Sequence, residues 1–113
     1  MANKFINTFV ELTTTGVIDI YTCPAATVAL IKSISVYNNN VASVDITVSI
    51  QDNSSSTIFP YAQKANLATL IKQEFLAGDA SSILILEESD ILKVQSSIAD
   101  PVVTLSILEQ DRT

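Results

Sequence analysis

The sequence lacks the residues on which most enzyme active sites depend. Histidine and tryptophan are absent, glycine occurs twice, and Cys23 is the only cysteine. Without histidine there is no Ser-His or Cys-His nucleophile pair, and the commonest metal ligand is missing. Without glycine-rich loops there is no phosphate cradle, and we interpret Cys23 as a small buried apolar residue. The sequence therefore predicts a protein that is not an enzyme and has no catalytic residue, cofactor or metal.

Charge is also scarce. Charged residues make up 16% of the chain, against about 25% in an average protein. Ser, Thr, Asn and Ala replace them, and such a neutral surface loses its water cheaply on contact with another surface. This favours a contact-forming protein over one that is merely soluble, although both interpretations stay open.

The charge that is present is acidic, with twelve Asp and Glu against six scattered Lys and Arg. A nucleic-acid partner requires a cationic footprint, so we expect none. No stretch approaches the roughly 20 apolar residues that cross a bilayer, and the N-terminus does not resemble a signal peptide. We therefore expect a soluble protein that is made in a cytoplasm and has no membrane partner.

Alternation of apolar and polar residues with a period of two is the main structural signal. The cleanest example spans residues 44–51, where four apolar residues fall on one face and polar residues on the other. The four are Val44, Ile46, Val48 and Ile50. A helix would scatter them around its circumference, so the segment predicts a half-buried strand.

The preceding segment, residues 28–37, alternates as well. Three of its apolar residues are expected on one face, namely Leu30, Ile34 and Val36. The three asparagines at 38–40 tolerate left-handed turn geometry. Residues 28–37 and 44–51 are therefore predicted to form a hairpin.

Short alternating segments continue along the rest of the chain. Strands are expected over residues 5–12, 17–21, 57–62, 83–86, 91–95 and 102–109. Pro60 cannot donate to a ladder, which predicts a sheet edge for residues 57–62. Residues 67–76 fit helix and strand spacing alike, and the context favours a strand.

Eight or nine short strands with frequent turn signals predict one all-β domain over residues 1–113. The expected architecture is an antiparallel β-sandwich of jelly-roll or Ig-like type. Residues 110–113 are expected to fray.

Two groups of side chains invite a ligand interpretation. Glu87, Glu88 and Asp90 could bind calcium, but they lack the spaced pattern of a calcium loop, so a solvated turn is favoured. Three tyrosines could form a sugar-binding platform, but rim and core positions are favoured for them. These are Tyr21, Tyr37 and Tyr61.

Two segments carry a resemblance that goes beyond periodicity. Residues 20–38, IYTCPAATVALIKSISVYN, resemble a sequence motif of small virion proteins of tailed bacteriophages. That motif reads Y-T-x-P followed by small residues and T-x-x-(I/V)-x-S-(I/V)-x-(V/I)-x-N. Residues 86–95, LEESDILKVQ, resemble their usual ending, L-x-x-G-D-x-(I/L)-x-V. Ser89 stands where that pattern has glycine, so this turn is expected to differ. The resemblance covers most of residues 17–109 in order.

The resemblance implies a β-sandwich subunit of a phage particle, assembled in the host cytoplasm and located in the virion. Within that class it favours a capsid decoration or cement protein, bound in many copies and as a homo-oligomer, with a trimer preferred. The implied partners are the major capsid protein or other virion subunits. A tail, neck or baseplate component and a glycan-binding module of the same fold remain alternatives.

Aromatic residues near a chain end often anchor on a partner or pair with its sheet edge. Residues 1–9 are therefore a possible interaction arm, although Phe5 and Phe9 could instead pack in the domain's own core. The candidate partner-contact residues are Lys4, Phe5, Phe9, Asn38, Asn39, Asn40 and Tyr61.

Overall fold

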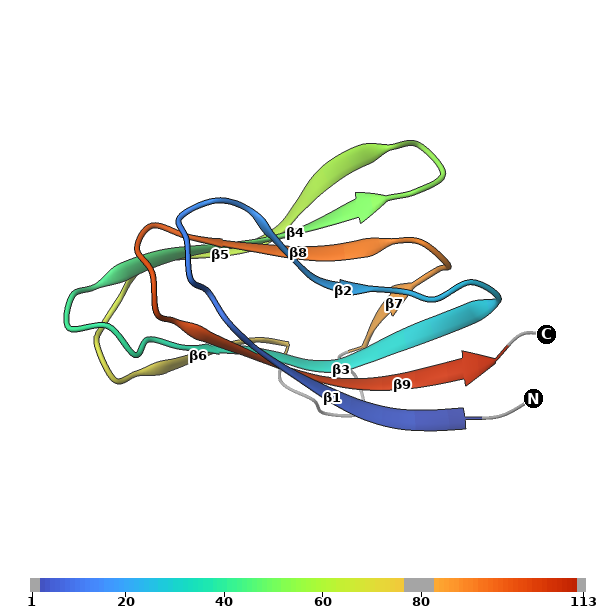
Figure 1. Ribbon diagram of the computed structural model, residues 1–113, viewed down its shortest axis with the longest axis horizontal. Coiled ribbons are helices and arrows are strands. Elements are labelled where there is room, and N and C mark those ends of the chain that lie inside the picture. The colour runs from blue at the N-terminus through green and yellow to red at the C-terminus, as the bar shows by residue number, and fades with distance from the viewer. Residues whose placement is uncertain (1–2, 77–82, 112–113) are drawn as a thin grey trace.

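The computed structural model describes residues 3–76 and 83–111, which contain nine β-strands and no helix (Figure 1). The strands are β1 (Asn3–Glu11), β2 (Ile18–Thr22), β3 (Thr27–Tyr37), β4 (Val44–Asp52), β5 (Thr57–Leu67), β6 (Lys72–Leu76), β7 (Leu84–Leu86), β8 (Ile91–Ser96) and β9 (Val102–Asp111). The predicted all-β class is confirmed. The ambiguous segment 67–76 holds the end of β5, a turn and β6. The described part of the chain has no helix of the length and apolarity needed to span a bilayer.

The strands form two antiparallel sheets that lie one above the other (Figure 1). Sheet A has the order β1-β9-β3-β6, with β7 also paired to β3, and sheet B has the order β2-β8-β4-β5. Consecutive strands lie in different sheets except for β4 and β5, which are both in sheet B, and β6 and β7, which are both in sheet A. If β6 and β7 count as two halves of one strand beside β3, eight strands make two four-stranded sheets. This is a jelly roll.

The predicted hairpin between residues 28–37 and 44–51 is wrong, because β3 lies in sheet A and β4 in sheet B. β4 instead forms a hairpin with β5, whose position at a sheet edge confirms the prediction from Pro60. The connection 38–43 is long enough to cross the roughly 10 Å between packed sheets. Alternation reports that a strand has a buried face, but not whether the next strand pairs beside it or packs opposite it.

The prediction that Leu30, Ile34 and Val36 share one face of β3 is also wrong. Its pairing with β9 shifts register between Ile31 and Ser33, which marks a β-bulge. A bulge inserts one residue and moves the following side chains to the other face. Ile31 and Ile34, three residues apart, are therefore both buried, and Leu30 lies on the opposite, outer face of the sheet.

The core between the sheets is aliphatic. It contains Leu12, Ile20, Cys23, Ala29, Ile31, Ile34, Val36, Val44, Ile46, Val48, Leu67, Leu76, Leu86, Leu92, Val94, Val103, Leu105 and Ile107. Three of the four phenylalanines, Phe5, Phe9 and Phe59, are instead more than half exposed. Phe59 lies on β5, and the β4–β5 hairpin projects beyond the sandwich (Figure 1). Aliphatic side chains and the small thiol of Cys23 thus fill the buried cluster, and most of the large aromatic area remains at the surface.

The turn before β8 keeps a glycine-like conformation. Ser89 has a φ of 69°, in the left-handed region where glycine is at ease and other residues are strained. Asp90 is buried and closes the turn by accepting the backbone N–H groups of Asn53 and Glu87, each at 3.0 Å. Ser89 therefore adopts a strained conformation that glycine would adopt at little cost, and the hydrogen bonds of Asp90 stabilise the turn.

Candidate interaction surface

The outer face of sheet A begins with the alternation of β1. Phe5, Asn7 and Phe9 point away from the core, whereas Ile6 and Val10 pack against it. The pairing of β1 with β9 runs from Asn3 to Glu11 without a register shift, so this alternation is not interrupted. Residues 3–9, predicted as a possible arm, are thus part of a paired strand, and Phe5 and Phe9 are 78% and 65% exposed.

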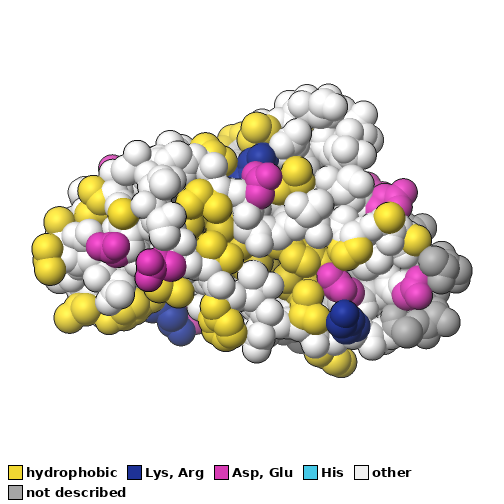
Figure 2. Space-filling view, viewed as in Figure 1, with side chains coloured by type: hydrophobic (Ala, Val, Ile, Leu, Met, Phe, Trp, Pro, Cys, Tyr) yellow, Lys and Arg dark blue, Asp and Glu magenta, His cyan; other side chains and the backbone are white. Residues whose placement is uncertain are grey.

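Cross-strand register extends this face into a continuous apolar row. Phe5 pairs with Leu108 of β9, Leu108 pairs with Leu30 of β3, and Leu30 pairs with Ile85 of β7. We call these four residues the apolar row. Ile85 at its far end is 60% exposed, and the two leucines between the ends are half-buried. Figure 2 shows hydrophobic side chains along the lower margin of the molecule, where Figure 1 places sheet A.

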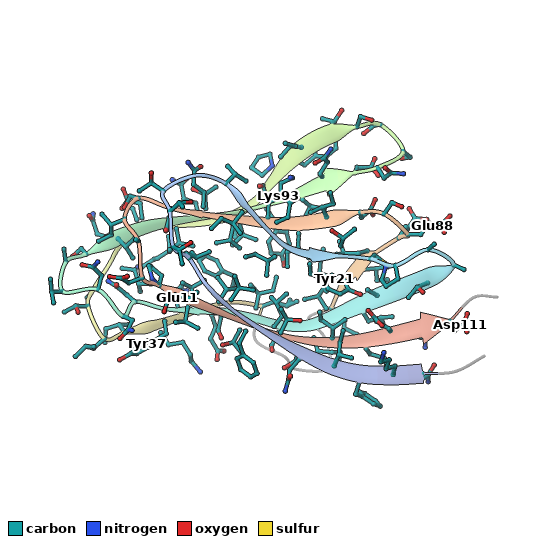
Figure 3. All side chains as sticks on the ribbon, viewed as in Figure 1. Glu11, Tyr21, Tyr37, Glu88, Lys93 and Asp111 are labelled. Atoms are coloured by element: carbon teal, nitrogen blue, oxygen red, sulfur yellow. The ribbon has the colours of Figure 1, made fainter. Side chains whose placement is uncertain are left out.

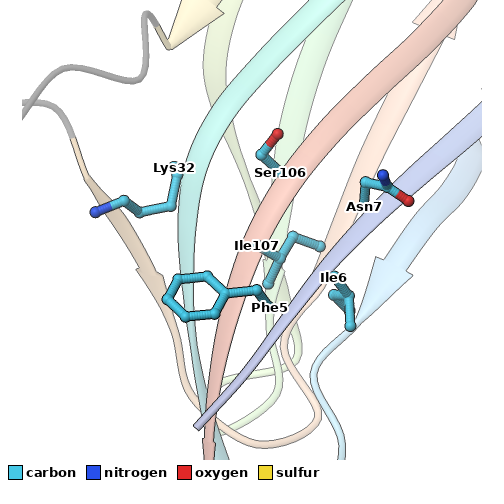
Figure 4. Close-up of a pocket in the computed structure, with 6 residues that line it drawn as sticks. All are labelled: Phe5, Ile6, Asn7, Lys32, Ser106 and Ile107. Carbon is cyan, nitrogen blue, oxygen red and sulfur yellow. The ribbon is translucent and has the colours of Figure 1, made fainter.

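A shallow depression lies beside the row (Figure 4). It is lined by Phe5, Ile6, Asn7, Lys32, Ser106 and Ile107. Lys32 lies at the bulge of β3, and its alkyl stem can cover apolar area while the ammonium group stays in water. The depression therefore combines an aromatic wall, neutral polar groups and one cation, which is a surface for contact and contains no arrangement for proton transfer.

The outer face of sheet A carries few charged residues. Lys32 lies near its centre, Glu11 at the end of β1, and Lys72 pairs with Glu74 at 3.0 Å on β6, at the opposite edge. Most of the acidic residues lie in other parts of the chain, in β2, β4 and the turns. Interface cores are depleted of charge and enriched in aromatic residues, and the outer face of sheet A has both properties.

The size of the exposed apolar surface indicates how it can be used. At roughly 200 Å² per large side chain, Phe5, Phe9 and Ile85 together expose roughly 400 Å². Burying this area would gain about 10 kcal/mol, whereas association costs about 4–15 kcal/mol. One such contact is therefore marginal, and the surface suits a protein that binds through several copies.

The buried Asn38 organises the opposite end of the sandwich. Its side-chain NH₂ donates to the carbonyls of Ala42 and Leu67, each at 2.9 Å, and its Oδ1 accepts from the N–H of Asn40 at 2.9 Å. Its backbone exchanges hydrogen bonds with Leu70 and Ile71. All of its polar groups are satisfied within the chain, so Asn38 holds two crossing loops together and leaves nothing for a partner to contact.

The other predicted contact residues do not share one surface with Phe5 and Phe9. Asn39 is exposed, and Asn40 is half-buried and donates to Asp100 at 3.0 Å. Tyr61 is 37% exposed on β5 of sheet B. Lys4 is exposed on β1 but points away from the outer face. The structure thus brings two of the seven predicted residues together, with Leu30, Leu108 and Ile85 beside them.

The acidic cluster and the tyrosines have structural partners. Glu88 accepts the N–H of Ala26 at 2.7 Å, so that carboxylate, like Asp90, supports the turn. Among residues 3–76 and 83–111, no three Asp, Glu or Cys side chains are placed to hold a metal ion. Tyr21 extends from β2 into the space between the sheets (Figure 3) and donates to Glu109 at 2.5 Å, whereas Tyr37 and Tyr61 lie on different sheets. The three rings do not form one platform.

The pKa values of Tyr21 and Cys23 are both raised, and burial is the largest cause in each case. Burial, followed by the hydrogen bond to Glu109, raises the pKa of Tyr21 far above its usual value. Burial also raises the pKa of the Cys23 thiol, and the side chain is 1% exposed. A thiol in that state is a poor nucleophile.

Known proteins resemble this chain in fold. No family model and no curated protein matches the sequence. A solved subunit of Bacillus endospore appendages, described as disulfide-linked pili, is 9% identical with a TM-score of 0.56, over 99% of this chain and 88% of that one. The Drosophila NLP core, described in terms of pentamer formation and histone binding, is 13% identical with a TM-score of 0.55, over 92% and 96%.

A third similar structure comes from infectious bursal disease virus, with 7% identity and a TM-score of 0.52. This chain is covered over 98% of its length but spans only 37% of that viral chain. At these identities the likeness establishes a common fold and nothing more.

Proposed function

We propose that this chain is a structural subunit of a phage particle, namely a capsid decoration or cement protein that docks on the shell through the outer face of sheet A. The observation that carries the proposal is the distribution of aromatic residues. Phe5, at one end of the apolar row, and Phe9, on the same face of β1, are exposed, whereas the buried core contains neither of them. A monomer gains nothing from aromatic side chains in water, whereas an interface gains most from them.

The fold and the bacteriophage resemblance also support a structural role in contact between subunits. The solved structures with this fold include an appendage subunit, a pentamer-forming core and a viral chain, and the first two of those descriptions concern assembly. The buried thiol and the engaged carboxylates of this chain leave its described residues without an evident reactive centre. A role in contact between subunits therefore fits better than a role in chemistry.

Self-association is part of the proposal, because one apolar row is too small to hold the chain on a shell. Linked copies convert later binding events into intramolecular ones, which raises the overall affinity without any new contact. The bacteriophage resemblance favours three copies as the unit. The proposed shell partner is the major capsid protein or another virion subunit.

Quantitative mass spectrometry of purified particles tests the proposal. A decoration protein is expected at a copy number comparable with that of the major capsid protein, whereas a tail, neck or baseplate component would match the subunits of a single ring. Absence of the chain from the particles would contradict a virion role.

Point substitutions then locate the surface. The double variant Phe5→Ser, Ile85→Ser is expected to reduce incorporation, and Ile58→Ser, at a site 53% exposed on sheet B, serves as the control. These changes are preferable to deleting residues 2–9, because a deletion would remove most of a strand that is paired along its length. Equal incorporation of all variants would rule out the outer face of sheet A as the docking surface.

A further inference from the structure

The four edges of the two sheets differ in how they are protected. Exposed edges present unpaired N–H and C=O groups, and proteins blunt them with short strands, bulges, proline and lysine. β5 carries Pro60 and Lys64 and has two register shifts in its pairing with β4. β2 has five residues and a register shift, and β6 and β7 have five and three residues. Three of the four edges are therefore blunted.

The edge of β1 lacks these devices along its centre. The strand has nine residues, no proline and no register shift, and its only charged residues, Lys4 and Glu11, lie near its ends. In the described part of the chain, no strand pairs with its outer side. A regular neutral edge of this length is suited to pair with another strand.

We propose that this edge pairs with β1 of a second copy, antiparallel and about a two-fold axis at Asn7, so that sheet A becomes continuous across two chains. This inference rests on the proposed docking through the outer face of sheet A, and it revises the proposed unit from three copies to two. The register follows from the outward positions, because Phe5 then lies opposite Phe9 of the second copy and Asn7 opposite itself. Cross-strand aromatic pairs are among those that stabilise a sheet, and the two copies contribute two such pairs.

Charge and symmetry select a second copy as the occupant. In the antiparallel register, Lys4 lies opposite Val10 of the other chain and Glu11 lies opposite its Asn3, so no two like charges face each other. A parallel register would place Lys4 beside Lys4 and Glu11 beside Glu11. The strand is thus complementary to itself, as an isologous contact requires. The pair also aligns two apolar rows on one surface, which doubles the area available for docking. A two-fold pair then replaces the trimer as the unit in solution.

Opposite charges at Asn7 provide a direct test. Asn7 is exposed, so Asn7→Lys and Asn7→Asp should fold, but each places like charges face to face across the axis. We expect sedimentation velocity to show a dimer for the wild type and dimerisation weakened by about tenfold or more for each variant at low salt. An equimolar mixture of the two variants should recover the dimer. Gln63→Lys and Gln63→Asp, on exposed β5, should leave it unchanged.

A cysteine at the axis provides the second measurement. Residues directly opposite in an antiparallel pair lie within the Cα separation that a disulfide spans, so Asn7→Cys should form a covalent dimer on mild oxidation while Gln63→Cys does not. A monomer at every concentration, a trimer, or variants of Asn7 that behave like those of Gln63 would overturn the pairing. If the chain were a monomer in solution but abundant in particles, the pairing would be wrong and the proposed function would stand. If the chain formed the dimer but were absent from particles, the pairing would stand and the proposed function would be wrong.

Discussion

Replacing Asn38 should lower the free energy of unfolding much more than replacing its exposed neighbour Asn39. Asn38→Ala removes three side-chain hydrogen bonds of a buried residue, two donated to Ala42 and Leu67 and one accepted from Asn40. At about 0.5–1.5 kcal/mol each, their loss should lower the free energy of unfolding by about 3 kcal/mol. Since a domain of this kind is stable by about 5–15 kcal/mol, that is a large fraction of the total.

The assay is urea unfolding followed by far-UV circular dichroism, with Asn39→Ala as the matched control. Asn39 has the same side chain one position along but is exposed, so its replacement should change the stability by no more than about 0.5 kcal/mol. If the two variants were equally stable, the hydrogen-bond network at Asn38 would not hold the loops as described. A loss confined to Asn38 would confirm that this residue serves the fold.

Three further predictions concern the turn, the core and the thiol. Ser89→Gly should raise the free energy of unfolding by about 0.5–1 kcal/mol, because it relieves a left-handed backbone, while Ser43→Gly, where φ is not positive, should lower it in the same urea experiment. Ile46→Ala, at a fully buried site, should cost about 2–5 kcal/mol, and Ile58→Ala, half exposed, should cost far less; similar losses would place the core elsewhere. Because burial raises the pKa of the Cys23 thiol, iodoacetamide should modify it rapidly only in denaturant, and fast labelling of the native protein would contradict its burial.

The strands were predictable from the sequence, and their arrangement was not. Alternation located residues 44–51 and placed Val44, Ile46 and Val48 on the buried face of their strand, because side-chain direction depends only on local backbone geometry. It did not reveal that β3 and β4 occupy different sheets, because strand pairing depends on distant segments. It also missed the bulge after Ile31, since the sequence carries no proline or glycine there to mark it.

The candidate surface was predictable only in part, for a related reason. The apolar row is assembled by register from four strands that are far apart in the sequence. A local signal was nevertheless present in β9. Leu108 points outward, whereas Thr104 and Ser106, which precede it on the same face, are polar. Ile85 lies in a strand that is apolar on both faces. Outward apolar residues in otherwise polar positions are thus the sequence feature that points to such a surface.

A cryo-EM map of the intact particle tests the central claim most directly. We expect density for this chain on the shell, with the outer face of sheet A, including Phe5 and Ile85, against a neighbouring subunit. A map in which that face is open to solvent while another face makes the contacts would contradict the account.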